Sequence, residues 1–466
     1  MDAFVHVFKT ALGYHLYDVN TDKVIDIPKS LYMFYKEGIK SEKAEKHIIK
    51  LKNEGYLKEK RVKHTKHTMT DLLPFYYQTK INFLVLQLTQ NCNLRCEYCV
   101  YSGGYNTRTH ANERLSFELA KRGMDYLIEH SSEHQRELAV GFYGGEPLLE
   151  FELIKKCVSY MENNAVGRET AYSLTTNGTL LTDEVITFFV KNKFNVMISI
   201  DGPEEIHDKS RKFAGSDKGS HKVVMKNLEK IQIKYPEYYQ EKVFFNTVVD
   251  PQKDYIKVTE YISNEPLMNK NIVNFSFISS EFAKEKRKAI KGFTETVGYD
   301  KFLGLLYRVG RLGYEDVPPL VRNMPDLDNL ENYLNKTYRY QLPNYSHRGG
   351  PCIPGVRKLF MNVYGKFFPC ERVCETMPEV IIGDIDSGVD LKKAEQLLNM
   401  ERYTISNCRN CWAYNHCGMC PANMEAGDIA TILLEKCNGR KNMLEEKLMD
   451  YWVLKKIKES LRDAHE

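Results

Sequence analysis

Between residues 80 and 281 the sequence alternates between strand-like and helix-like segments, and this alternation constrains the fold more than any other feature. Apolar runs of strand length span residues 81–88, 138–143, 171–175, 196–200, 243–249 and 273–278. Helical patterns separate them, at 116–129, 151–163, 183–192, 221–233 and 255–264. Nearly continuous apolar strands that alternate with helices predict a parallel sheet, either doubly wound or closed part-way into a (β/α) barrel. In both folds the chemistry gathers at the carboxyl ends of the strands.

The composition excludes several classes of protein. A chain of 466 residues predicts more than one domain. The balance of 66 basic against 62 acidic residues gives a net charge of +4, which argues against a dedicated nucleic-acid binder. No apolar run reaches the length of a membrane span, and the first residues carry no secretion signal, so we expect a cytoplasmic protein with no membrane partner.

Cysteine is the unusual residue type. The chain has 12 cysteines; three lie between residues 92 and 99, and eight lie between 352 and 437. A long chain without a secretion signal uses such groups for metal binding or catalysis more often than for disulfides. The remaining one, Cys157, falls on the apolar side of a helical pattern and is expected to be a small core residue.

The first group, Cys92, Cys96 and Cys99, directly follows the first predicted strand. Three thiolates at this spacing can converge on one inorganic centre. A tetrahedral zinc site needs four ligands, and no fourth lies nearby. A [4Fe–4S] cluster held by three cysteines instead keeps one iron open for another ligand. The group therefore favours an iron–sulfur cluster at the carboxyl end of the sheet.

The pattern CxxxCxxC, with Tyr98 before its last cysteine, resembles the signature of the radical S-adenosylmethionine (SAM) superfamily. The resemblance implies a partial (β/α)6 barrel in which the open iron chelates SAM and a 5′-deoxyadenosyl radical abstracts hydrogen. Later stretches at predicted strand ends, YGGEP, TTNGT and SIDGP, resemble further motifs of the family. The implied SAM-binding residues are Tyr98, Gly144, Gly145, Glu146, Asn177, Ser199 and Arg211. Of these, Glu146 is expected to meet the methionine ammonium group and Arg211 the methionine carboxylate.

The second cysteine group resembles the SPASM domain, an auxiliary-cluster module of radical enzymes that modify peptides. The resemblance implies a distal [4Fe–4S] cluster on Cys408, Cys411, Cys417 and Cys437. It implies a proximal cluster on Cys352, Cys370 and Cys420, for which Cys374 is the candidate fourth ligand. The spacing Cys417-x2-Cys420 is one residue shorter than the family pattern. With the first group this makes three clusters. Because CxxC pairs also bind zinc, a zinc-binding interaction protein is the distant alternative.

The N-terminal residues 1–57 show three short strand patterns followed by two helical ones. They resemble the winged-helix-like element that binds the leader of a ribosomally made precursor peptide in radical maturases. The expected organisation is this module, a linker at 58–79, the barrel at 80–281, a bridging region at 282–346, the SPASM domain at 347–443 and a C-terminal helix at 444–466.

Together these parts resemble maturases that form thioether cross-links in sactipeptides and ranthipeptides. The resemblance implies that a carbon-bound hydrogen is removed from the precursor peptide and that a cysteine sulfur bonds to that carbon. Glu371 matches in position an acidic residue that acts as a base in sulfatase-maturing relatives. Flavodoxin or ferredoxin is the expected electron donor. The alternatives within the superfamily are a maturase that forms carbon–carbon links and one that makes formylglycine.

Overall fold

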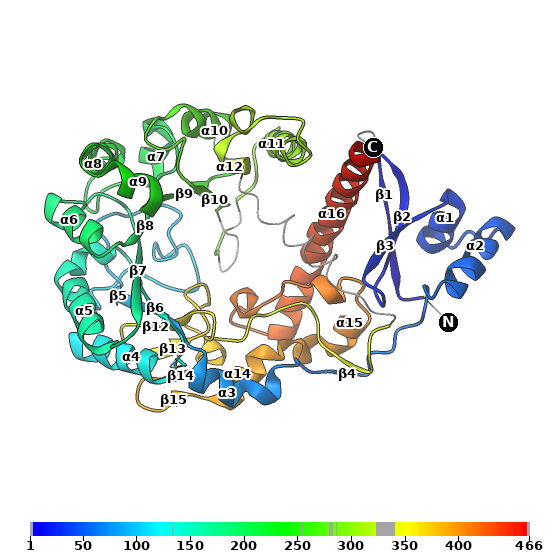
Figure 1. The fold of residues 1–466 in the computed structure, drawn as a ribbon, viewed down its shortest axis with the longest axis horizontal. Helices are drawn as coiled ribbons and strands as arrows, with labels where there is room; N and C mark the ends of the chain where they lie inside the picture. Colours follow the sequence, from blue (N-terminus) through cyan, green and yellow to red (C-terminus); the bar gives the residue numbers. More distant parts are fainter. Residues whose placement is uncertain are drawn as a thin grey trace.

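The computed structural model describes residues 3–132, 134–252, 255–278, 283–285, 287–322 and 341–463. Two β-sheet regions and a long C-terminal helix dominate the fold (Figure 1). Part of the predicted bridging region, 323–340, lies outside the described residues. Within the described residues, no helix combines the length and the apolar content that crossing a membrane requires.

The N-terminal module is a three-stranded antiparallel sheet followed by two helices. Its elements are β1 (Val5–Thr10), β2 (Gly13–Asp18), β3 (Lys23–Ile27), α1 (Lys29–Glu37) and α2 (Glu42–Asn53). Gly38 ends α1 in the left-handed conformation, with φ of 74°. The Ser41 hydroxyl caps α2 by accepting a hydrogen bond from the Ala44 amide. The predicted order of strands and helices is therefore confirmed, whereas its winged-helix character stays a prediction.

Six parallel strands form the main part of a ten-stranded sheet. They are β5 (Phe83–Thr89), β6 (Glu137–Gly144), β7 (Glu169–Thr176), β8 (Asn195–Ser199), β9 (Val243–Val249) and β10 (Val273–Phe277), paired in chain order. The main connecting helices are α4 (Phe117–Glu129), α5 (Phe151–Asn164), α6 (Asp183–Lys191), α7 (Glu204–Ser210), α8 (His221–Lys234), α9 (Pro236–Lys242) and α10 (Tyr255–Asn264). The sheet curves, and helices such as α4, α5 and α6 lie outside the curve (Figure 1).

The residues explain this alternation. Apolar side chains of the strands and helices form one continuous buried core, and Cys157 lies fully buried within it, as expected. Hydroxyl side chains cap two of the helices: Ser116 accepts from the Leu119 amide at the start of α4, and Thr182 accepts from the Val185 amide at the start of α6. Because the six strands run in parallel, the loops that follow their carboxyl ends lie at one edge of the sheet.

The cysteine-rich region continues this sheet. Strand β12 (Leu359–Met361) pairs in parallel with β5, and β13 (Lys366–Phe368), β14 (Gly383–Asp384) and β15 (Gly388–Val389) extend the sheet beyond it. Short helices α14 (Leu391–Leu398) and α15 (Ile405–Arg409) follow. The predicted linker at 58–79 contains β4 (His64–Thr65), which pairs with β11 (Tyr345–Ser346), and α3 (Leu73–Thr79), whose Leu73 and Tyr77 are buried.

Helices α11 (Phe293–Arg308) and α12 (Pro319–Arg322) follow β10. The last helix, α16 (Ile429–Asp463), starts well before the expected boundary at 444 and carries Cys437. Leu444, Leu448 and Trp452 of α16 pack against Phe8 and Tyr17 of the N-terminal sheet in a shared core. The N-terminal module is thereby attached to the C-terminal helix (Figure 1).

Candidate functional site

The three cysteines of the first group lie on the loop that follows β5. All three thiols are partly buried, and backbone N–H groups donate to two of the sulfur atoms. The Leu94 amide lies 3.3 Å from Cys92 Sγ, and the Tyr101 amide lies 3.5 Å from Cys99 Sγ. Donors aimed at sulfur favour the thiolate form, which is the form that binds metal.

Burial opposes ionisation of these thiols in the absence of a bound cation. It raises the pKa of Cys92 to about 12 and that of Cys96 to about 11. The other cysteines of the group add to the rise at Cys92, which shows that the three thiols lie close together, while Arg211 lowers the pKa of Cys96. Metal binding here must therefore release protons. Three neighbouring thiols with N–H donors at their sulfur atoms fit an iron–sulfur cluster.

A single metal ion needs its ligand atoms close around one point, whereas an iron–sulfur cluster needs them farther apart. Among the described residues, no group of three or more His, Cys, Asp or Glu side chains is arranged to hold a metal ion. In a [4Fe–4S] cluster each thiolate binds a different iron, so its cysteines are spread around a larger centre.

Two glycines let the end of β6 press against the cysteine loop. A Cβ on Gly144 would lie 2.2 Å from the carbonyl oxygen of Thr89, and one on Gly145 would lie 2.0 Å from that of Asn91. Gly144 also has a φ of 141°, a backbone conformation that residues other than glycine rarely adopt. The Gly145 and Glu146 amides donate to the same two carbonyls, at 2.9 Å each. Both predicted glycines therefore set the position of the loop.

The Glu146 carboxylate ties the ends of β6 and β7 together. It accepts hydrogen bonds from the Leu148 amide at 3.0 Å, the Thr176 hydroxyl at 2.7 Å and the Asn177 amide at 2.8 Å. The side chain is buried, and burial raises its pKa to about 7. The structure thus gives this carboxylate three protein donors, and its expected contact with a methionine ammonium group stays a prediction.

Asn177 connects the end of β7 to the cysteine loop. Its side-chain amide donates to Asn93 Oδ1 at 2.8 Å and lies 3.7 Å from Cys92 Sγ. Ser199, the last residue of β8, is buried and lies opposite Asn246 of β9. The predicted residues of three successive strand ends therefore lie at the same edge as the cysteines, as the parallel sheet requires.

Arg211 forms a buried ion pair that the sequence did not predict. Its guanidinium donates to both carboxylate oxygens of Asp201, at 2.8 and 3.1 Å. The Tyr98 hydroxyl donates to the same carboxylate, and the Arg211 guanidinium lies 5.5 Å from the centre of the Tyr98 ring. Burial would raise the pKa of Asp201, but Arg211, together with His207 and Tyr98, outweighs burial and holds this pKa below its usual value. Arg211 is thus already paired, and its expected contact with a methionine carboxylate stays a prediction.

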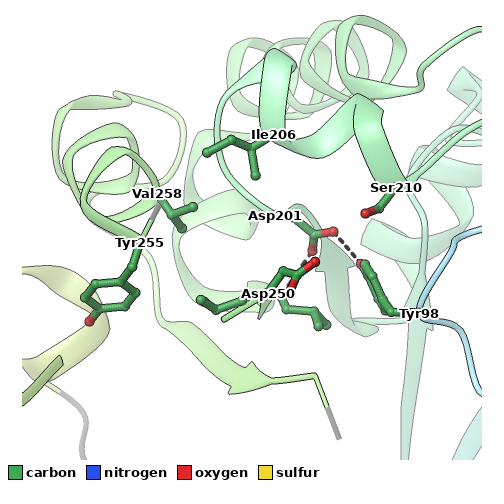
Figure 2. Close-up of a pocket in the computed structure, with 9 residues that line it drawn as sticks. Tyr98, Asp201, Ile206, Ser210, Asp250, Tyr255 and Val258 are labelled. Atoms are coloured by element: carbon green, nitrogen blue, oxygen red, sulfur yellow. Dashed lines mark hydrogen bonds between the residues drawn. The ribbon is translucent and has the colours of Figure 1, made fainter. Parts of the chain in front are cut away.

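A small pocket opens beside this ion pair. Its polar wall contains Tyr98, Asp201 and Asp250, and its apolar wall contains Ile206 of α7 and Val258 of α10. Figure 2 shows the hydrogen bond from Tyr98 to Asp201 at the pocket. The pocket therefore combines buried charge with apolar surface at the carboxyl ends of β8 and β9, and its free volume of about 10 Å³ has room for about one water molecule.

The four predicted distal cysteines, Cys408, Cys411, Cys417 and Cys437, lie together. Burial raises the pKa of Cys411 to about 11, and Cys417 and Cys408 add to the rise. Cys417 also raises the pKa of Cys437, second only to burial. Four mutually interacting thiols fit the ligand set of a [4Fe–4S] cluster.

The three predicted proximal cysteines form a separate group. Burial raises the pKa of Cys370 to about 11, and Cys420 and Cys352 contribute. Cys374, the candidate fourth ligand, is fully buried, and its thiol lies 3.3 Å from the Asn106 carbonyl and 3.1 Å from the Thr376 hydroxyl. Its polar contacts in the described structure therefore differ from those of the other three, and its ligand role stays a prediction.

Glu371, the candidate base, lies next to Cys370 in the chain. One carboxylate oxygen pairs with Lys358 Nζ at 3.0 Å. The other oxygen is buried and has no hydrogen-bond partner among the described residues. The carboxylate is therefore attached on one side and open to a further donor on the other.

Arg108, which the sequence reasoning did not single out, links the two cysteine regions. Its guanidinium pairs with Glu375 at 2.5 Å, donates to the Tyr143 hydroxyl at 3.2 Å and donates to the Glu371 carbonyl. Glu375 also accepts from Gln87 of β5. These side chains are buried, and the contacts to Glu371 and Glu375 join residues that are more than 250 positions apart in the chain, so no local pattern could reveal them. Asp201, by contrast, stands inside the SIDGP stretch and could have been chosen from it.

Comparison with known proteins agrees with this geometry. Residues 86–280 match the family model described as Radical SAM superfamily. The chain is 34% identical over 153 residues to a cysteine-type anaerobic sulfatase-maturating enzyme of Clostridium novyi (strain NT), a match that covers 32% of this chain and 40% of that relative. A 22% identity over 376 residues covers 74% of this chain and 69% of the radical SAM cyclopropyl synthase TigE of Paramaledivibacter caminithermalis.

A solved structure shares the fold. The structure described as native anSMEcpe with bound AdoMet superposes with a TM-score of 0.55 at 19% identity, covering 77% of this chain and 98% of that one. The sequence match to the sulfatase-maturating relative from Clostridium novyi, in contrast, spans less than half of its length. Residues 86–280 thus form a Radical SAM superfamily domain.

Proposed function

We propose that this chain is a radical SAM peptide maturase that removes a carbon-bound hydrogen from a ribosomally made precursor peptide and forms thioether cross-links from cysteine sulfur to carbon. The observation that carries this proposal is the separation of ten cysteines into groups of three, three and four, with the first group at the strand ends of the radical SAM domain. A group of three leaves a cluster iron without a protein thiolate, so both three-cysteine groups could take a ligand from outside the chain.

The residues that would hold the cofactors follow from this grouping. Three [4Fe–4S] clusters would lie on Cys92, Cys96 and Cys99, on Cys352, Cys370 and Cys420, and on the four distal cysteines. SAM would lie beside the first group, near Tyr98, Gly144, Gly145, Asn177, Ser199 and Arg211. When bound, SAM and the first cluster supply the radical chemistry that removes an unactivated hydrogen.

The chain's own residues position the reactants and move a proton. The glycine pair and Glu146 fix the first cysteine loop, and the Arg211–Asp201 pair holds the wall of the adjoining pocket. To form a thioether, the substrate thiol must lose its proton, and one electron must also leave as sulfur bonds to the carbon radical; a proposed auxiliary cluster would accept this electron. Glu371 has one buried oxygen without a hydrogen-bond partner in the described structure, and this oxygen can accept that proton.

The N-terminal module is the proposed docking site for the leader of the precursor peptide. In the order β1–β2–β3, strand β3 lies at an edge of the sheet, and an extended peptide can add to such an edge as a further strand. Flavodoxin or ferredoxin is the proposed reductant. Fluorescence anisotropy with a labelled leader, on the full chain and on a variant with Ile25→Pro in β3, tests the docking site.

Formylglycine or carbon–carbon bond formation is the second candidate. It is favoured by the names of the relatives, which state sulfatase maturation and cyclopropyl synthesis and not thioether formation. The products differ in composition. A thioether removes two hydrogens and one free thiol per event and keeps the sulfur. Formylglycine made from cysteine loses the sulfur, and a carbon–carbon link leaves every thiol free.

The test is an anaerobic reaction of the reconstituted chain with SAM, a reductant and a cysteine-containing precursor peptide encoded near it. High-resolution mass spectrometry before and after thiol alkylation separates the three products. The variant in which Cys92, Cys96 and Cys99 are alanine is the control and should give none of them. A product that has lost sulfur, or that keeps all its thiols, would reject thioether formation in favour of the corresponding alternative.

A further inference from the structure

Arg348 is a buried cation at the distal cysteine group. Its side chain is 3% exposed, and its guanidinium donates to Cys417 Sγ at 3.2 Å. Arg348 therefore contacts one of the four distal cysteines directly, through a guanidinium that is almost completely buried.

The backbone around Arg348 packs closely against residues 414–419, here called the distal loop. Two glycines follow it, and a Cβ on Gly349 would lie 2.2 Å from the Asn415 carbonyl oxygen, while one on Gly350 would lie 2.9 Å from the Cys417 carbonyl oxygen. The Gly349 amide donates to the Tyr414 carbonyl at 3.0 Å. The segment that carries Arg348 thus approaches the distal loop more closely than residues with side chains would allow.

Glu401 holds the guanidinium only weakly. The Arg348 Nε atom lies 3.7 Å from Glu401 Oε2, which is an ion-pair distance rather than a hydrogen bond. The same Glu401 oxygen pairs with His347 Nε2 at 3.1 Å. Arg348 Nε and Glu401 Oε1 have no hydrogen-bond partner among the described residues. The sulfur of Cys417 is therefore a closer partner for this buried cation than the carboxylate is.

A neutral thiol is a weak acceptor, whereas a thiolate accepts a charge-assisted hydrogen bond well. Arginine stays protonated even when it is buried. We propose that Arg348 is a positioning residue of the distal iron–sulfur site: its guanidinium holds the Cys417 sulfur in place by a hydrogen bond, and its fixed positive charge raises the reduction potential of the cluster. This inference rests on the proposed cluster at the distal cysteines and is independent of the reaction that the enzyme performs.

The experiment uses the full chain in a background in which the other six clustered cysteines are alanine, namely Cys92, Cys96, Cys99, Cys352, Cys370 and Cys420. After anaerobic reconstitution, iron is counted, its loss to a chelator is timed and the midpoint potential is measured by EPR-monitored titration. Arg348→Gln should move the midpoint to a more negative value and speed iron loss by about 10- to 100-fold. Arg348→Lys keeps the charge and should keep the midpoint near that of the parent.

Two further variants keep the inference testable. Arg409→Gln removes the same charge next to Cys408, but the Arg409 guanidinium donates to the Lys63 carbonyl, so this control should change neither readout. Glu401→Gln removes a negative charge and should shift the midpoint in the positive direction, which tests the inference even if Arg348→Gln does not fold.

The outcomes are distinct. Parent-like potential and iron loss in Arg348→Gln, or an unshifted midpoint in Glu401→Gln, would overturn the role of Arg348. A parent that binds no iron at the distal cysteines would overturn both the cluster and this role. A wild-type chain that loads all clusters but modifies no peptide would reject only the proposed reaction.

Discussion

The buried pair of Arg211 and Asp201 gives a quantitative prediction. Asp201→Asn leaves the guanidinium buried without its counter-charge while it keeps the shape of the side chain. Two unit charges about 4 Å apart interact by about 4 kcal/mol at an effective dielectric constant of 20. Removing one partner of a buried pair typically costs about 3–5 kcal/mol. We therefore expect the opening free energy of the region around β8 and β9 to fall by about 3–5 kcal/mol.

Hydrogen exchange measured by mass spectrometry is the suitable assay, because it resolves local opening in a chain with several structural units. The Val248 amide, which donates to Asp201 Oδ1 at 3.1 Å, should lose protection in Asp201→Asn. Asp217→Asn breaks the exposed pair with Lys212 and is the matched control, with little change expected. The double variant Asp201→Asn with Arg211→Met should recover part of the loss, since no unpaired charge remains.

The pH dependence has a definite sign. Because Arg211 holds the pKa of Asp201 below its usual value, the stabilisation is fully present above the pKa of the unfolded chain and is lost as the pH falls through the folded value. The difference between wild type and Asp201→Asn should thus shrink only below about pH 4. Equal protection of the Val248 amide in both proteins at neutral pH would refute the reasoning.

Two other perturbations follow from the contacts. Gly145→Ala places a Cβ 2.0 Å from the Asn91 carbonyl oxygen, so we expect the first cysteine loop to shift and to bind less iron after reconstitution. The control is Gly298→Ala in α11, because a Cβ there meets no atom within 4 Å. Normal iron loading in Gly145→Ala would contradict the positioning role of Gly145. Asp26→Ala removes the acceptor of the Trp452 indole N–H (2.9 Å) and the partner of Lys456 (3.0 Å), so the fluorescence of Trp452 should change. Although burial acts to raise the pKa of Asp26, hydrogen bonds from Lys456 and Trp452 hold this pKa below its usual value. The fluorescence of the wild-type protein should therefore change only in acid, below about pH 4. A change in fluorescence near neutral pH would count against this assignment of Asp26.

The sequence predicts the parts of this molecule that depend on local pattern. The six apolar runs were sufficient for the parallel strands, because strands buried on both faces must be apolar throughout. Spacing and family resemblance placed Cys408, Cys411, Cys417 and Cys437 in one group, and the structure brings them together. The pairing of β12 with β5 was not predictable, because a strand of three residues is too short to show a period.

Arg108 and Arg348 could not be predicted as buried site residues, and the physical reason is the same for both. Arg108 and Arg348 are long cations whose sequence neighbours do not mark them as buried, and arginine is usually found at the surface. Their partners, Glu375 and Cys417, lie far away in the chain, so the contacts appear only once the fold is known. Helix α3 was missed because the basic residues before it suggested a connection in water, whereas Leu73 and Tyr77 pack into the core.

The parallel pairing of β12 with β5 has a consequence for any shortened form of this protein. In the sheet order, β5 lies between β6 and β12, so the strand that leads into the first cysteine loop is an interior strand only while the C-terminal region is present. A version that ends before residue 359 would expose the backbone of β5 as a bare edge, flanked by apolar residues such as Leu84 and Leu86. Exposed apolar edges recruit strands from other chains. By pairing β12 with β5, the cysteine-rich region therefore also protects the edge of β5 from pairing with strands of other chains.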